Sequence, residues 1–325
     1  MTKTSVLSRL SFLFVIFFTF AFVFSNYTSS QSKSKDEKEF VQKESQPKSV
    51  VDPTPTPHNL VGSFYTLDYG TDAKLLLNNK GNTQLEVQPT LYNKQGQELQ
   101  LPPVTVEPQS FRFINLADWA AIGGESYRSG NIKLFHTGKD LVLGSQIYLT
   151  QEEYSLSFEE KLAELGKFDS RRQEAVWVMP TLQTKVEVVL TNTTNAPLSV
   201  TAKLAKNPNT SGNPQVFQLA AHETKLLDLR QDFVNGNQFA NSTIVGLSLE
   251  HTAVNDALLA RVMVGDIAKG YSNVVQFSNP AGGKSSEYQG VGFQIEDIDG
   301  QHLAPIIVAR NVGTSTATIT AKVPY

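Results

Sequence analysis

The sequence predicts an all-β protein with two tandem immunoglobulin-like β-sandwich repeats and the start of a third, after an N-terminal hydrophobic helix and a disordered linker. Three observations predict this organisation. The chain resembles itself at a shift of 113 residues, apolar and polar residues alternate within each copy, and a polar stretch follows an apolar N-terminus. The expected units are 1–25 (signal peptide or membrane anchor), 26–57 (linker), 58–168 (first repeat), 169–284 (second repeat) and 285–325 (partial third repeat).

Composition excludes several classes of protein. The 325 residues allow about two to three domains, and 40% hydrophobic residues are enough for a sizeable core. The net charge of -3 comes from 28 basic and 31 acidic residues that are well mixed, so no basic surface for nucleic acid is expected. The absence of cysteine excludes disulfides, thiolate metal sites, a cysteine nucleophile and a lipoprotein anchor.

The N-terminus has the pattern of an export signal. Lys3 and Arg9 precede an apolar run over 10–24, which is typical of a secretory signal. The run is shorter than the roughly 20 residues that span a bilayer. We expect an exported protein, in the periplasm, at the cell surface or secreted. The segment is either cleaved after Ser25 or kept as an inner-membrane anchor through residues 10–24.

Residues 26–57 predict a disordered linker. They are rich in Ser, Lys, Glu and Gln, and such a stretch cannot bury enough apolar surface to offset its ordering entropy. Pro53, Pro55 and Pro57 alternate with Thr and His, which favours an extended backbone. The linker is either a spacer that lifts the folded part off a membrane or wall, or a tail left after signal cleavage.

The internal repeat organises the rest of the chain. A shift of 113 carries Leu77 to Leu190 and Asn79 to Asn192, and a shift of 115 later aligns His136 with His251. In a third copy Asn311 takes the same place, but the chain ends only about two strands into this copy. Two strands cannot form an independent sandwich. They either pack on the second repeat or begin a longer array, and we favour the longer array.

Within each copy the apolar residues have the period of a β-strand. Val186, Val188 and Leu190 alternate with other residues, a turn follows at 192–197, and a second alternating run begins at Leu198. About seven short strands in about 110 residues are typical of an immunoglobulin-like sandwich. The expected strands lie near 75–77, 85–87, 104–106, 111–116, 132–135 and 141–149, and near 186–190, 198–204, 217–219, 225–229, 245–249 and 257–264.

One segment predicts a helix. Ser157 and Glu160 have the spacing of a capping box, and Gly166 stands where a helix would end. We expect a short helix that closes the end of the first sandwich, with Glu159 and Glu160 on its solvated surface. A hinge or a partner-binding element is the alternative.

The strand segments resemble those of a known protein family. Members are exported bacterial proteins with tandem immunoglobulin-like β-sandwich repeats and no assigned activity, so the resemblance implies fold and location but no site residues. A fainter likeness, to the β-sandwich transducer of the cyanobacterial sensory rhodopsin, rests on the strand–Asn–turn–strand opening and bears on fold alone. The resembling segments are 75–92, 180–204, 219–230, 246–252 and 270–280.

Few residues are candidates for a site. His136 and His251 occupy equivalent positions at a strand end, and a repeated histidine could contact a ligand. A hydrogen bond that stabilises a turn explains the pair as well. Trp119 is the remaining candidate for a surface aromatic that stacks on a sugar. No metal site, cofactor or catalytic set is expected, because no ligand spacing and no nucleophile–base pair can be assembled.

Two functions follow as expectations. The first is a non-enzymatic scaffold for adhesion or envelope interaction, whose partner is an envelope protein or a polysaccharide. The alternative is a carbohydrate- or other ligand-binding module that uses Trp119, His136 and His251, possibly accessory to a catalytic domain beyond residue 325. Exposure of these three side chains in one groove would favour the alternative, and burial would count against it.

Overall fold

The computed structural model describes residues 56–151, 156–206, 210–280, 311 and 318–320. The chain divides into two compact units, Met1–Asp52 and Pro53–Tyr325, and all described residues belong to the second. The predicted N-terminal segment (1–25), nearly all of the linker (26–57) and most of the partial third repeat (285–325) lie outside the described residues. None of the helices in the described part is long and apolar enough to cross a membrane.

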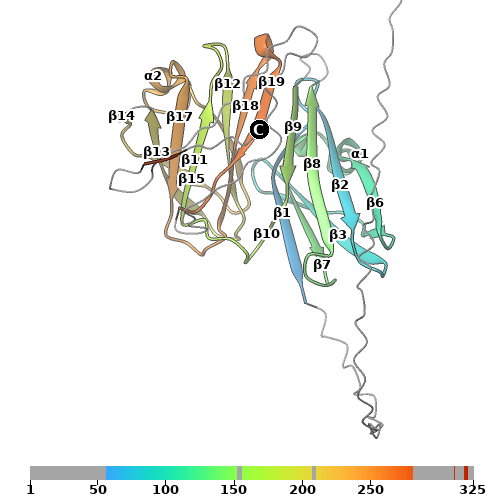
Figure 1. Ribbon diagram of the computed structural model, residues 1–325. Coiled ribbons are helices and arrows are strands. Elements are labelled where there is room, and N and C mark those ends of the chain that lie inside the picture. Colours follow the sequence, from blue (N-terminus) through green and yellow to red (C-terminus); the bar gives the residue numbers. More distant parts are fainter. Residues whose placement is uncertain (1–55, 152–155, 207–209, 281–310, 312–317, 321–325) are drawn as a thin grey trace, which may run out of the picture. The chain divides into compact units, whose positions relative to one another are not determined.

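The described residues form antiparallel sheets with few helices, which confirms the all-β class (Figure 1). In the first sandwich one sheet has the order β10-β1-β7-β3-β4 with β5 beside β3, and the other has the order β6-β2-β8-β9. Their bounds are β1 (His58–Thr66), β2 (Asp72–Asn79), β3 (Leu85–Asn93), β4 (Glu98–Gln100), β5 (Val104–Val106), β6 (Ser110–Asn115), α1 (Leu116–Gly123), η1 (Glu125–Tyr127), β7 (Ser129–His136), β8 (Leu143–Gln151), β9 (Leu156–Lys161) and β10 (Ala163–Glu164).

The second sandwich has the same strand order. One sheet runs β11-β17-β13-β14 with β15 beside β13, and the other runs β16-β12-β18-β19. The β1-β7-β3 order of the first sandwich thus recurs as β11-β17-β13, and β6-β2-β8-β9 recurs as β16-β12-β18-β19. The bounds are β11 (Arg172–Val178), β12 (Lys185–Asn192), β13 (Leu198–Lys206), β14 (Thr210–Ser211), β15 (Gln215–Leu219), β16 (Thr224–Asp228), α2 (Gly236–Ala240), β17 (Ile244–Glu250), β18 (Leu258–Asp266), η3 (Ile267–Lys269) and β19 (Tyr271–Gln276).

The alternation in the sequence places one side of each strand in a core. Leu75 and Leu77 of β2 are fully buried in the first core, and Val186 and Val188 of β12 are fully buried in the second. Since successive side chains of a strand point to opposite faces, the residues between them face outward. Each pair of sheets therefore encloses its own apolar core.

An asparagine at the end of β2 and another at the end of β12 each anchor the turn that follows. Asn79, at the end of β2, donates through Nδ2 to the carbonyl oxygens of Thr83 (2.8 Å) and Val106 (3.0 Å). Asn192, at the end of β12, donates to those of Ala196 (2.7 Å) and Ala220 (2.8 Å). A buried amide that joins a turn to another strand explains why asparagine stands at both positions.

The predicted helix at 157–166 is wrong. The segment forms β9, which pairs with β8 and places Tyr148 opposite Glu159, and then β10, which pairs with β1. Leu156, Phe158 and Glu160 are buried while the residues between them are exposed, so the period is two. Tertiary pairing and the burial of these side chains override the capping-box spacing.

Candidate interaction surfaces

His136 lies inside the first sandwich rather than in an open groove. It ends β7, is 3% exposed, and stacks on His58 with ring centroids 4.8 Å apart. Its Nδ1 accepts a hydrogen bond from the backbone N–H of Gly138 at 3.1 Å. Burial, and then the charge of His58, lower the pKa of His136 to about 4, although Glu164 opposes the shift. His136 is therefore a neutral turn-stabilising residue near neutral pH.

His251 is likewise buried, at 7% exposure, just after β17. Its Nε2 lies 2.9 Å from Oγ of Ser170, which resembles a nucleophile–base pair. However, Ser170 is fully buried, its hydroxyl donates to the carbonyl oxygen of Asn255 at 2.6 Å, and it accepts from the N–H of Leu258 at 3.1 Å. A serine with its hydroxyl engaged and closed to solvent cannot attack a substrate.

Trp119 lies in α1, half-buried against the core of the first sandwich. Asn115 caps this helix, because its side-chain oxygen accepts from the N–H of Ala117 at 3.1 Å. No hydrogen bond or ring contact joins Trp119, His136 and His251 among the described residues. The structure therefore does not bring the three predicted ligand-binding residues into contact.

Among the described residues, the side chains of His58, Asp140 and Glu164 form the group that is most like a metal site. Its Nδ1 lies 2.7 Å from Oε1 of Glu164, and its Nε2 lies 3.5 Å from Oδ1 of Asp140. Because Glu164 already bonds one ring nitrogen, only His58 Nε2 and Asp140 remain as direct ligands, and a structural zinc site needs four. Nζ of Lys167 also lies 3.9 Å from Oδ2 of Asp140, so a metal ion would compete with this lysine for the carboxylate. The trio fits a polar contact between β1, β10 and the β7–β8 loop, called the clasp below, better than a metal centre.

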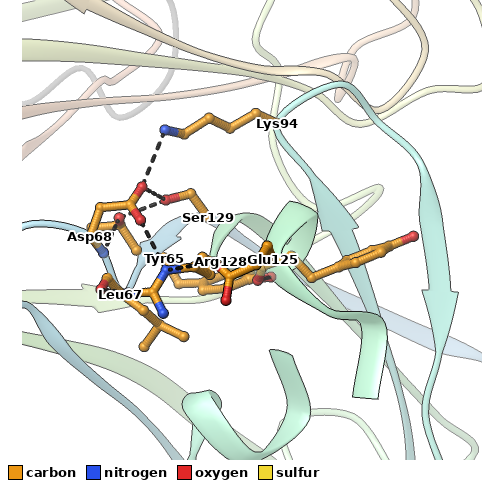
Figure 2. Close-up of polar contacts among 9 residues, drawn as sticks. Tyr65, Leu67, Asp68, Lys94, Glu125, Arg128 and Ser129 are labelled. Carbon is orange, nitrogen blue, oxygen red and sulfur yellow. Dashed lines mark hydrogen bonds and ion pairs between the residues drawn. The ribbon is translucent and has the colours of Figure 1, made fainter. Parts of the chain in front are cut away.

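A second polar cluster closes the other end of β1. Figure 2 shows Asp68 facing Arg128, Ser129 and Lys94. Arg128 Nε is 3.3 Å from Asp68 Oδ1, its Nη2 donates to the carbonyl oxygen of Leu67 at 2.6 Å, and Ser129 Oγ donates to Asp68 Oδ2 at 2.9 Å. Burial opposes ionisation, but these hydrogen bonds and the nearby charges outweigh it and lower the pKa of Asp68. The cluster holds a charged carboxylate that latches the β1–β2 turn onto β7.

The two sandwiches are joined by backbone and side-chain hydrogen bonds. Thr191 of β12 donates through Oγ1 to the carbonyl oxygen of Ser63 in β1 at 2.7 Å. Asn131 of β7 donates through Nδ2 to Oγ1 of Thr224 in β16 at 3.0 Å, and the N–H of Thr224 donates to the carbonyl oxygen of Lys94 at 3.1 Å. These contacts attach the sheet β16-β12-β18-β19 to the first sandwich.

A buried ion pair lies at the centre of this junction. Arg261 of β18 places Nε 3.3 Å from Oε1 of Glu160 in β9, and both side chains are less than a tenth exposed. Ser63 supports the carboxylate by donating from its N–H (2.9 Å) and its hydroxyl (2.7 Å). This pair was not predicted from the sequence, because Glu160 was expected on the solvated surface of a helix. Leu156, Phe158 and Glu160 stand at every second position, and this strand period could have placed Glu160 on the same buried face as Leu156 and Phe158.

Apolar contacts complete the junction. Val189 of β12 is fully buried and belongs to the core of the first sandwich, not of its own. Leu226, Met263 and Val274, from the same sheet, pack against that core as well. A small pocket at the junction is lined by both sandwiches, including Phe64 and Val189. The second sandwich thus fills the open side of the first.

An aromatic row lies on the outer face of the sheet β6-β2-β8-β9. Phe111 and Phe113 of the edge strand β6 are 67% and 57% exposed, and their rings meet edge to face at 5.9 Å. The ring of Phe113 lies 6.3 Å from that of Tyr148 in β8. Three neighbouring exposed or half-buried rings on one sheet face mark an interaction surface.

Two polar clusters of the described residues have geometries that a site could use. However, the serine–histidine pair is sealed from solvent, and the histidine–carboxylate cluster forms the clasp. No protein-family model, curated protein or solved structure matches the chain.

Proposed function

We propose that the protein is a non-enzymatic scaffold outside the cytoplasm, built from tandem immunoglobulin-like repeats, that binds a component of the cell envelope. The buried junction between the two sandwiches is the observation that carries this proposal. Glu160 and Arg261 pair there, and Val189 enters the neighbouring core, so the two sandwiches present their outer surfaces in one fixed arrangement. When several binding surfaces are held in one fixed arrangement, weak contacts at each of them add up to a higher overall affinity for the partner.

The N-terminus supports the location. A basic start and an apolar run would bring the chain to the membrane, and the polar linker would separate the sandwiches from it. The absence of cysteine leaves stability to the cores and to the junction, and both cores are extensive in the described residues.

The test is fractionation of cells that express the full chain, followed by a binding assay. We expect the protein in the envelope or the medium, with an intact mass that is either complete or short of about the first 25 residues. Purified protein should then cosediment with envelope fragments and not with ribosomes or nucleic acid. Recovery in the cytosol, or no retention on envelope fragments, would reject the scaffold function.

Carbohydrate binding is a second candidate, and one observation favours it. The rings of Phe111, Phe113 and Tyr148 form a row of the kind on which sugars stack. The predicted site at Trp119, His136 and His251 is less suited, because both histidines are buried. Affinity electrophoresis in gels containing polysaccharide would test the aromatic row, with Phe111→Ser plus Phe113→Ser as the variant and Val216→Ser, an exposed valine of β15, as the control.

A further inference from the structure

The turn that joins β1 to β2 carries an aromatic side chain in solvent. Tyr69 is 90% exposed, the highest value among the large hydrophobic side chains of the described residues. No hydrogen bond or ring contact joins this side chain to the rest of the described chain. Single exposed aromatic residues are common on protein surfaces, so exposure alone does not mark a site. The backbone of the turn supplies the second observation.

That backbone is unfavourable for a tyrosine. The N–H of Thr71 donates to the carbonyl oxygen of Asp68 at 3.1 Å, which closes a turn with Tyr69 and Gly70 as its central residues. Both central residues have a positive φ, 56° and 72°, as in a type I′ turn. Glycine and asparagine are the usual residues at such positions, because a larger side chain is strained there. The sequence thus has a tyrosine where the backbone favours glycine.

The architecture does not require this conformation. In the second sandwich the turn between β11 and β12 is closed in the same way, since the N–H of Thr184 donates to the carbonyl oxygen of Thr181 at 3.2 Å. Neither Leu182 nor Gln183, the central residues of that turn, has a positive φ. The strain is therefore specific to the first sandwich. Strained residues of this kind concentrate at binding sites, where the surrounding contacts hold them in place.

The contacts of Asp68 hold the strained turn (Figure 2). Its N–H donates to Oγ1 of Thr66 at 3.1 Å. Its carboxylate accepts from Nε of Arg128 at 3.3 Å and from Oγ of Ser129 at 2.9 Å. The residue before Tyr69 is thus fixed through both its backbone and its side chain. A turn that is already ordered loses little conformational entropy when a partner binds it.

The shape and charge of the turn indicate a protein as the partner. Sites for sugars and small molecules are normally concave, because the protein surrounds the ligand. The Tyr69 ring instead stands in solvent at the end of the sandwich, so the partner has to supply the pocket. The charged side chains nearby are balanced, two cations with two anions: Lys94, Arg128, Asp68 and Glu125. No excess charge would attract an anionic membrane, whereas tyrosine beside arginine is typical of a protein–protein contact.

We propose that Tyr69 is the central contact residue of the scaffold and inserts into an apolar pocket of a protein in the cell envelope. The inference rests on the proposed scaffold function, and it names the contact residue and the class of partner. The hydroxyl of Tyr69 would find its hydrogen-bond partner in that pocket, as tyrosine hydroxyls usually do when they are buried. Polysaccharide and lipid are the other components of an envelope, and protease digestion distinguishes both from a protein.

The experiment measures cosedimentation of the protein with envelope fragments of the source cells over a range of protein concentrations. The chain is used in the form recovered from cells, in nanodiscs if it keeps its N-terminal segment. Wild type should bind saturably, and digestion of the fragments with proteinase K should abolish binding. Tyr69→Gly removes the ring and relieves the strained backbone, so it should be at least as stable as wild type. It should nevertheless bind about tenfold more weakly or worse, and Tyr69→Phe should bind more tightly than Tyr69→Gly.

Leu141→Gly is the matched control. Leu141 is also large and apolar, is 79% exposed and has a φ of 60°, but it follows β7, whose last residue, His136, lies opposite His58 at the other end of β1. This variant should keep its stability and bind like wild type.

Three outcomes would overturn the proposal. Equal binding by Tyr69→Gly and wild type would reject the role of Tyr69 and leave the scaffold function standing. Binding that survives protease digestion would reject a protein partner, again without touching the scaffold function. Wild type that does not bind intact fragments would reject both the contact residue and the scaffold function.

Discussion

Arg261 and Glu160 lie 101 residues apart in sequence, yet Nε of the arginine is 3.3 Å from Oε1 of the glutamate where the two sandwiches meet. Ser63 adds two hydrogen bonds to the same carboxylate. Such a pair fixes how two surfaces meet, because any displaced arrangement leaves an unpaired charge in an apolar setting. The pair therefore indicates a defined interface between the two sandwiches rather than a flexible connection between independent domains.

Breaking one member of this pair should be costly. Arg261→Met leaves the Glu160 carboxylate buried without its counter-charge, and we expect unfolding free energy to fall by about 3–5 kcal/mol. Replacing both residues, as Glu160→Gln with Arg261→Met, should restore most of the loss, because the neutral amide removes the unpaired charge and can still bond the N–H and hydroxyl of Ser63. Urea denaturation of the three proteins checks this. A double variant no more stable than Arg261→Met would show that the charges themselves were not the cause.

The asparagine anchors give a second prediction. Asn79→Ala removes two hydrogen bonds donated by Nδ2 and one accepted from the N–H of Gly81, so stability should fall by about 2–3 kcal/mol. Asn192→Ala should lose a similar amount in the second sandwich. The control is Asn78→Ala on the outer face of β2, where a change within about 0.5 kcal/mol is expected. Equal effects at Asn78 and Asn79 would contradict the anchoring role.

The all-β class was predictable because the alternation of apolar and polar residues is a local signal. The shift that aligns Asn79 with Asn192 marks a position that has the same contacts in both sandwiches. The segment from Ser157 was mispredicted because its capping-box spacing is also local, whereas the pairing of β9 with β8 is not. Where a short segment fits both the helical period and the strand period, pairing with a neighbouring strand decides which structure forms.

The candidate sites were harder to predict, because burial and side-chain contacts depend on residues that are distant in sequence. His136 and His251 were identified by their equivalence, but sequence could not reveal that both would be buried. Glu160 could not be assigned to the junction, because its partner Arg261 stands in the other sandwich. Phe113 looked like an ordinary strand residue, and only the sheet register shows that its equivalent, Leu226, packs on the first sandwich.

Acidification should destabilise the first sandwich through His136. Its folded-state pKa of about 4 is below the ordinary 6.5, so between these values the unfolded chain binds a proton that the folded protein does not. Stability rises with pH under that condition. The contribution is therefore fully present above pH 6.5 and is lost as pH falls to 4, by about 3 kcal/mol at most.

Denaturation of wild type and His136→Asn at several pH values measures this contribution. The variant should lose less stability on acidification than wild type, but still some, since burial also lowers the pKa of His222 and of His251. Identical slopes for the two proteins would exclude His136 as a source of the acid sensitivity.

Asp68 gives a second contribution that is lost on acidification, at lower pH than that of His136. Because its pKa is lowered in the folded protein, Asp68 contributes stability above its ordinary pKa of 3.8 that is lost as pH falls. Asp68→Asn should destabilise the protein by about 1 kcal/mol at neutral pH, since the cluster is partly exposed and solvent screens its charges. Hydrogen exchange at the amide of Leu67 should accelerate in the variant, and unchanged exchange there would disprove the latch.

The Ser170–His251 pair allows a direct test of whether Ser170 can act as a nucleophile. A nucleophile must reach its substrate, but Ser170 is fully buried and donates its hydroxyl to the carbonyl oxygen of Asn255. A fluorophosphonate probe should therefore leave folded protein unlabelled at Ser170. Ser170→Ala should instead lower stability by about 1–3 kcal/mol, because it leaves polar groups of His251 and Leu258 without their partner. Labelling that disappears in Ser170→Ala would overturn the structural role and reopen an enzymatic one.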